Sequence, residues 1–471
     1  MFTLEYLPIG GDGYFHYTMA SQLSLSNPVQ SIEALPFTLL GERGPDHHWL
    51  IHWLQKPLTL LCASTEYGIA SATIAWAALV PAFLSAILRF YRIPYAPLIA
   101  TIGVWSLYIL PSRFLMFRAQ NAAIVMVAFL ALVMSAQRYL WVGVLIFFFN
   151  HAYQGVVLSG AVGLAVLMAH GLIYKRFDRQ LISASLAGYI LSLLTSPWFP
   201  DNIRYFLVIM MGRLISPLDN LALMGREWMP PEPSMFIEFG LVGHVCLVLS
   251  WLILGTQRSF FTGTTKLKRA LTFTILASIF LLLYARHWRM GEFYGPISAM
   301  SFGFCLALLA NRRKLLVGLL ILFTTVLTVG HQYLKSPLNK ATVINVESFC
   351  DYLEDHAEPG NLIFNLSWPS FPYLYHCQPR LTYISGLDGL MLSQGDSDTF
   401  RIWYYLSRGY LGYLDSKDVT SVFSKTNSAY ILLGPHSANV KVWLLGEIKG
   451  SKLVVSDGSG HLISLPREGY E

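Results

Sequence analysis

Residues 8–23 read PIGGDGYFHYTMASQL, and they place a carboxylate and an imidazole in a chain that is otherwise strongly apolar. Asp12 and His16 are four residues apart, which aligns them on one face of a helix that begins near Asp12. An aspartate at a helix start also caps free backbone N–H groups. The stretch therefore predicts either a helix cap or a carboxylate at the membrane interface, where it can accept a proton or hold a metal ion.

The composition favours a polytopic membrane protein. Of the 471 residues, 54% are hydrophobic and only 13% are charged, with a mean hydropathy of +0.49. Soluble domains carry about 25% charged residues. The formal charge of +6 is what basic cytoplasmic loops produce, so it needs no nucleic-acid partner.

Apolar runs bounded by charged residues, Pro or Gly predict about ten spans. They fall near residues 66–88, 94–111, 121–136, 139–150, 153–172, 181–197, 235–254, 269–285, 294–310 and 314–331. The first 30 residues contain no basic segment followed by an apolar one. We expect that a span preceding Asp12 is missing from this chain; the alternative is that the N-terminus crosses the membrane without one.

Lysine and arginine are concentrated in alternate loops, which indicates the orientation. Thirteen of them, with Asp178 as the single acid, share one predicted side in the loops at 89–94, 136–141, 174–180, 255–269 and 311–314. The positive-inside rule makes that side cytoplasmic. The opposite side still holds arginines interleaved with carboxylates, which predicts a site for an anionic ligand because guanidinium binds phosphate in a bidentate fork.

From about residue 340 the composition becomes that of a soluble domain. Short strand-like runs at 361–368, 380–387, 428–434, 452–457 and 461–466 alternate with helical stretches at 397–411 and 437–448. The predicted organisation is a mainly α membrane domain (1–335, with a first extracytoplasmic loop at 10–57) followed by a small extracytoplasmic α/β domain (340–471). Cys350 and Cys377 would pair if this domain is extracytoplasmic, and the sequence leaves that open.

A second cluster lies in GERGPDHHWLIHWLQKP (41–57). It contains Glu42, Asp46, His47, His48 and His52. His48 and His52 have the i, i+4 spacing of a helical metal site, but the HExxH zinc signature is absent. The alternative is an interfacial helix whose Trp and His side chains lie among the lipid headgroups.

A third cluster is RHWRMGEFYGP (286–296), in which Arg286, Arg289 and Glu292 step by three. They would align if the preceding helix continues, and Pro296 would then start the next span. The residues form either an interfacial salt-bridge cluster or a phosphate site. Arg118, just before an apolar helix, and Glu227, in the loop 198–234, are further candidates.

The layout resembles the GT-C superfamily of membrane glycosyltransferases, which includes oligosaccharyltransferase catalytic subunits and protein mannosyltransferases. GGDGYFHYTMA (10–20) resembles the acidic motif of their first extracytoplasmic loop, with Asp12 in the carboxylate position. GPDHHWLIHWLQKPLTL (44–60) is similar to the run toward their second span, and many members end in a soluble extracytoplasmic domain. The chain departs from them in lacking a leading span, a DxD motif and a clear WWD-type motif.

The resemblance implies transfer of a sugar from a polyprenyl-phosphate-linked donor to a glycan, lipid or protein acceptor, at the periplasmic face of a bacterial inner membrane. Asp12 would be the catalytic carboxylate of an inverting reaction. Arg286, Arg289 and Arg118 would bind the donor phosphate. The second-line candidates for acceptor binding are His16, Glu42, Asp46, His48, Glu227 and Glu292. A divalent metal such as Mg or Mn remains open.

Two other functions remain as alternatives. A transporter or flippase for a lipid-linked glycan would carry charges within its spans and repeat symmetry, neither of which the sequence shows. A non-catalytic membrane assembly protein would bind a partner through its C-terminal domain.

Overall fold

The computed structural model describes residues 11–29, 32–41, 44–60, 65–105, 117–153, 156–211, 228–257, 264–309, 318, 326, 346–386 and 389–466. Contacts divide these residues into two units. The first contains the described parts of His47–Ser196 and Arg226–Ala341. The second contains those of Gly10–Asp46, Pro197–Gly225 and Thr342–Glu471.

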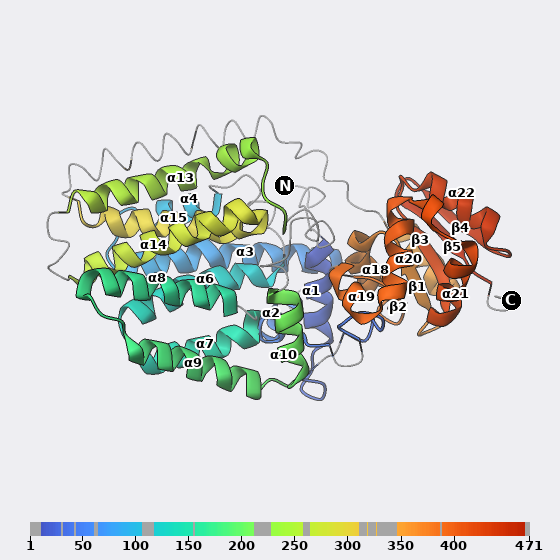
Figure 1. Cartoon of the computed structure of the whole chain (residues 1–471), viewed down its shortest axis with the longest axis horizontal. Coiled ribbons are helices and arrows are strands. Elements are labelled where there is room, and N and C mark those ends of the chain that lie inside the picture. Colours follow the sequence, from blue (N-terminus) through green and yellow to red (C-terminus); the bar gives the residue numbers. More distant parts are fainter. Residues whose placement is uncertain are drawn as a thin grey trace. The chain divides into compact units, whose positions relative to one another are not determined.

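The first unit is a bundle of helices (Figure 1). Its elements are α2 (Trp49–Leu60), α3 (Thr65–Phe90), α4 (Ala96–Trp105), α6 (Ala119–Ser135), α7 (Tyr139–Tyr153), α8 (Val156–Tyr174), α9 (Arg179–Leu194), α13 (Pro233–Gly255), α14 (Thr265–Arg286), the 3₁₀ turn η5 (Trp288–Met290) and α15 (Gly291–Leu306). Helix α14 packs on α8 and α15, and α7 packs on α9. Each of the first nine predicted spans overlaps one of these helices, and the tenth, 314–331, lies outside the described residues apart from two positions.

Some helices of the first unit have the length, and some the exposed apolar surface, that a membrane bundle requires. Within the part of the chain that the structure describes, three apolar segments are long enough to cross a bilayer: Gly68–Phe90, Val156–Tyr174 and Thr265–Arg286. On α9, Leu186, Ile190, Leu191 and Leu194 are each more than half exposed. Water-soluble surfaces rarely carry such a continuous apolar face, whereas lipid stabilises one.

The second unit is built around a five-stranded sheet. Its elements are α1 (Gly11–Gln22), α10 (Asp201–Tyr205), the π-helix η2 (Phe206–Met211), α17 (Glu347–His356), β1 (Leu362–Asn365), η7 (Trp368–Ser370), α18 (Phe371–Cys377), β2 (Thr382–Tyr383), α19 (Gly389–Gly395), α20 (Ser397–Arg408), η8 (Leu411–Tyr413), α21 (Ser416–Thr426), β3 (Ser428–Leu433), α22 (Ala438–Glu447), β4 (Lys452–Asp457) and β5 (Gly460–Ser464). The strand order is β2-β1-β3-β5-β4. Strand β1 is parallel to β2 and β3, whereas β5 is antiparallel to β3 and β4. Each predicted strand-like run overlaps one of these strands.

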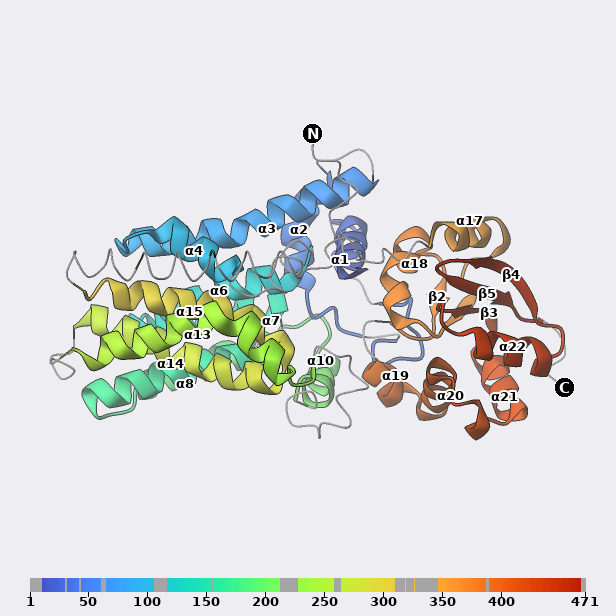
Figure 2. The ribbon, with the colours of Figure 1, turned by 90° about the horizontal axis from the view of Figure 1, so that it is seen from above.

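Alternate side chains of the strands enter two different cores, as the period of two of a β-strand requires. On β3, Tyr430 and Leu432 pack with α1, α17 and α18, whereas Ile431 and Leu433 pack with α20, α21 and α22. Figure 2 shows α17 and α18 on one side of the strands and α20, α21 and α22 on the other. The second unit is therefore a three-layer α/β/α sandwich.

The described residues between 11 and 46 belong to this sandwich. The backbone N–H of Tyr383 donates to the carbonyl of Ala34 at 2.7 Å, and that of Leu39 donates to the carbonyl of Met391 at 2.8 Å. Phe15 and Met19 of α1 lie in the same core as α17 and α18. The predicted first loop, 10–57, is thus divided: its part up to Asp46 clusters with the C-terminal elements, because these bonds and apolar contacts join it to the edge of the sheet.

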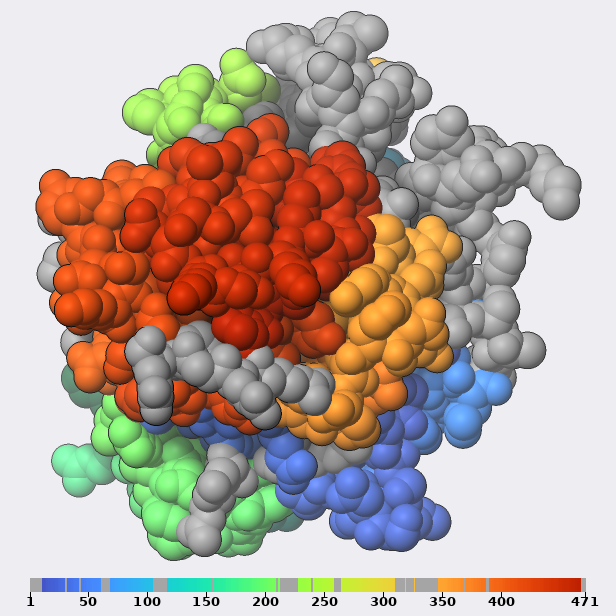
Figure 3. Space-filling view, turned by 90° about the vertical axis from the view of Figure 1, so that its right-hand side faces the viewer, coloured from blue at the N-terminus to red at the C-terminus, as the bar shows by residue number. Residues whose placement is uncertain are grey.

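A disulfide closes one layer of the second unit. Cys350 of α17 is bonded to Cys377 at the end of α18, with the Cα atoms 6.1 Å apart. The sequence left this pairing open, and the structure contains it. In Figure 3 the surface of α17 (light orange) adjoins that of the last strands (red), and α17 packs on β4.

Breaking the disulfide should destabilise the second unit by about 3–4 kcal/mol, because the bond closes a loop of 27 residues in the unfolded chain. The thermal midpoint of the detergent-solubilised protein should fall on reduction. The double variant Cys350→Ser/Cys377→Ser should have the lower midpoint with or without reductant. An equal effect of reductant on both proteins would contradict the assignment.

Candidate functional site

Asp12 lies in the first turn of α1, and a glycine places that turn close to α18. A Cβ atom added at Gly11 would lie 3.1 Å from the Tyr373 ring and 3.4 Å from Pro372. A side chain at this position would require the Tyr373 ring to move by a few tenths of an ångström. Asp12 is half-buried, and His16, one turn later, is 4% exposed. The helix predicted over these two residues is confirmed.

An aromatic side chain of α18 lies beside Asp12. The rings of Tyr14 and Tyr373 are 4.9 Å apart. Burial, with smaller contributions from Tyr14 and Asp12, raises the pKa of the Tyr373 hydroxyl to about 12. The hydroxyl therefore stays protonated at neutral pH and can donate a hydrogen bond next to the carboxylate.

An imidazole of α18 completes this cluster. Nδ1 of His376 lies 2.6 Å from the Thr18 hydroxyl, and its ring is 5.2 Å from that of Tyr14. Burial lowers the pKa of His376, so the imidazole is neutral at pH 7. The contact between α1 and α18 thus holds a carboxylate, a protonated phenol and a neutral imidazole, and the carboxylate and the imidazole are groups that can accept a proton.

The second predicted cluster is divided between the two units. Asp46 is 4% exposed in the second unit, where its charge, after burial, helps to raise the pKa of Tyr375 to about 12. His48 belongs to the first unit, and its ring centre lies 6.1 Å from that of His52 and 5.3 Å from that of Tyr153. Among the described residues, no three His, Cys, Asp or Glu side chains converge as a metal site requires. Glu42 lies outside the described residues.

Arg118 and Glu292 form a buried ion pair in the first unit. Their side chains are 2% and 4% exposed, and Nη1 of Arg118 is 3.5 Å from Oε1 of Glu292. Arg118 is the N-cap residue of α6, and its carbonyl accepts a 2.7 Å bond from Nε1 of Trp76. Glu292 lies in the first turn of α15, where the helix dipole favours a carboxylate. Glu292 is thus paired with Arg118, a partner outside the predicted cluster of Arg286, Arg289 and Glu292.

The predicted alignment of Arg286, Arg289 and Glu292 on one continuous helix is wrong. Helix α14 ends at Arg286, because His287 adopts an extended conformation (φ −138°, ψ 113°). A 3₁₀ turn then leads into α15, which begins at Gly291, so the prediction that Pro296 starts the next helix is also wrong. Residues at i, i+3 spacing share a face only within one continuous helix, and this helix ends before His287.

The turn between α14 and α15 is fixed by the segment that precedes α13. Nδ1 of His287 donates to the carbonyl of Trp228 at 2.7 Å, and the backbone N–H of Trp288 donates to the carbonyl of Met229 at 3.0 Å. The guanidinium of Arg289 stacks over the Trp228 ring at 5.3 Å, which holds its charge in a defined place. Glu227, the predicted residue next to Trp228, lies outside the described residues.

Sequence reasoning missed three residues: Tyr373, His376 and His287. Tyr373 and His376 are three residues apart on α18, a spacing that puts them on one helix face. That spacing was readable in FPYLYHC (371–377), but its contact with Asp12 spans more than 350 residues. His287 lies within RHWRMGEFYGP (286–296), directly after Arg286.

The fold of the chain is similar to the folds of ArnT and an archaeal oligosaccharyltransferase, which agrees, at the level of the fold, with the resemblance seen in the sequence. The structure is similar to that of ArnT from Cupriavidus metallidurans in the apo state, with a TM-score of 0.54 and 13% identity over 98% of this chain and 96% of that chain. It is also similar to the oligosaccharyltransferase from Archaeoglobus fulgidus in the apo form, with a TM-score of 0.52 and 12% identity over 92% of this chain and 67% of that chain. The same archaeal enzyme, tethered to an acceptor peptide containing the NVT sequon, gives a TM-score of 0.50 at 12% identity, over 93% of this chain and 67% of that chain. No protein-family model and no curated protein matches the sequence.

Removing one partner of the buried ion pair should be costly. Arg118→Met leaves the Glu292 carboxylate buried without this arginine, which costs about 3–5 kcal/mol of stability. The double variant Arg118→Met/Glu292→Leu should recover most of the loss, since an apolar pair of similar size needs no charge solvation. Thermal midpoints in detergent measure both effects. A double variant as unstable as Arg118→Met would contradict a pairwise role.

Acid should destabilise the cluster around His376. The pKa of His376 is lower in the folded protein than its value of about 6.5 in the unfolded chain, so the folded protein favours the neutral imidazole. The contribution of His376 to the free energy of unfolding is therefore fully present above about pH 6.5 and is lost as the pH falls below that value. His376→Gln should therefore show a smaller fall of the thermal midpoint between pH 7.5 and 5 than the wild type. The matched control is His356→Gln, which removes an exposed imidazole of the same unit. An unchanged pH dependence in His376→Gln would contradict the interpretation.

Proposed function

We propose that this chain is an integral-membrane glycosyltransferase that moves a sugar from a polyprenyl-phosphate-linked donor to an extracytoplasmic acceptor. The observation that carries the proposal is the shared fold with ArnT, which extends over 98% of this chain and 96% of that one. A shared fold does not by itself establish a reaction. The reaction depends on the side chains that this chain places at the site.

Asp12 is the proposed catalytic carboxylate. The acceptor oxygen or nitrogen attacks the anomeric carbon of the donor sugar while the bond from that carbon to the phosphate oxygen breaks. Asp12 takes the proton of the acceptor, and the polyprenyl phosphate leaves with the bonding electron pair, so the configuration inverts. The half-buried position of Asp12 in the first turn of α1, which packs closely on α18, supports this role, because a general base must be held in a fixed orientation.

Arginines take the role of binding the leaving phosphate. Arg289, which stacks on Trp228, and Arg286, at the end of α14, are both half-exposed, and a planar guanidinium suits a phosphate oxygen pair. Arg118 is the weaker candidate, because it is 2% exposed and paired with Glu292. His16, Asp46 and His48 are buried, which favours a supporting role in shaping the acceptor site.

The proposed setting is the inner membrane of a bacterium, with the second unit in the periplasm. The Cys350–Cys377 disulfide supports that location, since disulfides form and persist in oxidising compartments. The lipid-facing apolar helices agree with a donor that is itself anchored in the bilayer.

Asp12→Asn should lower the turnover rate of transfer by roughly 10²–10⁴-fold, the usual contribution of a general base. The KM for the donor should change little, because the donor phosphate is bound by other residues. The assay follows release of polyprenyl phosphate from a panel of polyprenyl-phosphate-linked sugars by the purified protein in nanodiscs.

Asp201→Asn is the matched control for this experiment. Asp201 also lies in the first turn of a helix of the second unit and is also half-buried. It should retain transfer close to the wild-type rate. Full transfer by a folded Asp12→Asn protein would refute the catalytic assignment.

A further inference from the structure

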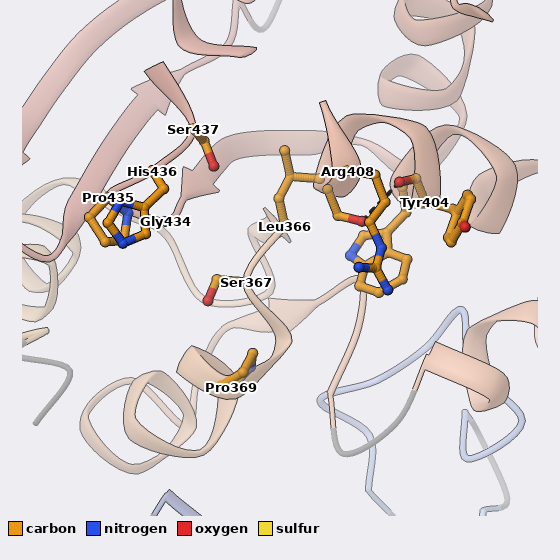
Figure 4. A pocket seen from close by; sticks show the side chains of 11 residues that line it. Leu366, Ser367, Pro369, Tyr404, Arg408, Gly434, Pro435, His436 and Ser437 are labelled. Carbon is orange, nitrogen blue, oxygen red and sulfur yellow. Dashed lines mark hydrogen bonds between the residues drawn. The ribbon is translucent and has the colours of Figure 1, made fainter. Parts of the chain in front are cut away.

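A pocket in the second unit is lined by none of the residues to which a role is assigned above. Its volume is about 360 Å³, at the small end of the range of roughly 300–1,000 Å³ for small-molecule sites. Three segments line it: the residues after β1, the residues after β3 and the last turns of α20 (Figure 4). A space of this size suits a single sugar ring with one substituent.

The pocket lies at the carboxyl ends of two neighbouring strands whose connections lead to opposite faces of the sheet. Strands β1 and β3 are parallel neighbours, and the segments that follow their carboxyl ends both line the pocket. From β1 the chain continues into α18 on one face of the sheet, toward β2. From β3 it continues into α22 on the other face, toward β4 and β5. Open α/β sheets bind ligands where neighbouring connections diverge in this way, because the divergence leaves a crevice.

The lining favours a negatively charged ligand. It contains the guanidinium of Arg408 and the imidazole of His436, and none of the described lining residues is an Asp or Glu. The Arg408 guanidinium lies 5.8 Å from the centre of the Tyr404 ring, a contact that limits its movement. In Figure 4, Arg408 and His436 lie on opposite sides of the pocket, with Ser367 and Ser437 between them.

The start of α22 adds donors to the same wall. Ser437 is the N-cap residue of this ten-residue helix, but its hydroxyl makes no capping bond, and the first turn contains no acid. The positive end of the helix dipole is therefore not offset by a side chain of that turn. The Ser437 and Ser367 hydroxyls can donate to an anion or to the hydroxyls of a sugar.

We infer that this pocket binds a monosaccharide-sized ligand that carries a phosphate or carboxylate group. The anion preference rests on Arg408, His436 and Ser437. The choice of a sugar as the carrier rests on the proposed glycosyl transfer. A site of this kind in the second unit would recognise an anionic sugar separately from the residues assigned to the reaction.

Binding to the full-length protein in nanodiscs tests the inference by titration calorimetry. Glucose 1-phosphate and glucuronate are the two anionic probes, and glucose is the neutral control. At least one anionic probe should bind, more weakly as salt concentration rises, and glucose should bind at least tenfold more weakly. The stronger of the two probes identifies the anionic group. If neither binds, or if glucose binds equally well, the inference is wrong.

Two variants locate the binding. Arg408→Gln should lower the affinity about tenfold or more, because it removes a charge-assisted bond. Ser437→Ala should lower it about two- to tenfold without loss of stability, since the Ser437 hydroxyl caps no backbone group. The matched control is Arg401→Gln, which removes an exposed arginine of the same helix, paired with Asp418 at 3.3 Å. It should bind as the wild type does.

A further variant separates this site from the proposed donor site. The double variant Arg286→Gln/Arg289→Gln should keep the binding, because neither arginine lines the pocket. Loss of binding in that variant, with binding retained by Arg408→Gln, would overturn the inference. The outcome is independent of the catalytic proposal: Asp12→Asn should bind the probes as the wild type does, whatever its transfer rate.

Discussion

The packing of α1 on α18 is the contact on which the candidate site depends. Gly11 lets the start of α1 approach Tyr373 at van der Waals distance, the Thr18 hydroxyl meets His376 at 2.6 Å, and the Tyr375 hydroxyl donates to Gln22 at 3.0 Å. These three contacts run along the whole of α1. They fix its rotation, and therefore the direction in which Asp12 points, through elements that the chain makes more than 350 residues later.

The local structure was largely predictable from the sequence. Apolar runs located the helices of the first unit, and the alternating, β-branched and aromatic runs located all five strands, because both signals depend on neighbouring residues. The failure at Arg286–Glu292 has the opposite origin. The helix ends before His287 because His287 and Trp288 bond to the carbonyls of Trp228 and Met229, which lie in a distant segment of the sequence. The residue pattern within 286–296 contains no information about those partners.

The candidate site was predictable in its acidic part and not in its aromatic part. Asp12 stands out because a carboxylate beside glycines is rare in an apolar chain. Tyr373 and His376 do not stand out, since aromatic residues make up 14% of the sequence and most serve packing. Arg118 shows the same limit: its charge suggested a phosphate ligand, but its pairing with Glu292 depends on two helix starts that are far apart in sequence. Contacts with residues far away in the sequence determine which charged side chains remain available to bind a ligand.

One short turn connects the two places where chemistry is expected in the second unit. Pro369 lines the pocket at the end of β1, and its carbonyl lies 3.5 Å from the position of a Cβ atom at Gly11. The turn that contains it leads directly into α18, which carries Tyr373 and His376 to α1. Any movement of this turn on filling the pocket would therefore press on the helix start that holds Asp12. Because protein interiors are closely packed and transmit strain, the contact between this turn and Gly11 physically links the pocket to the first turn of α1.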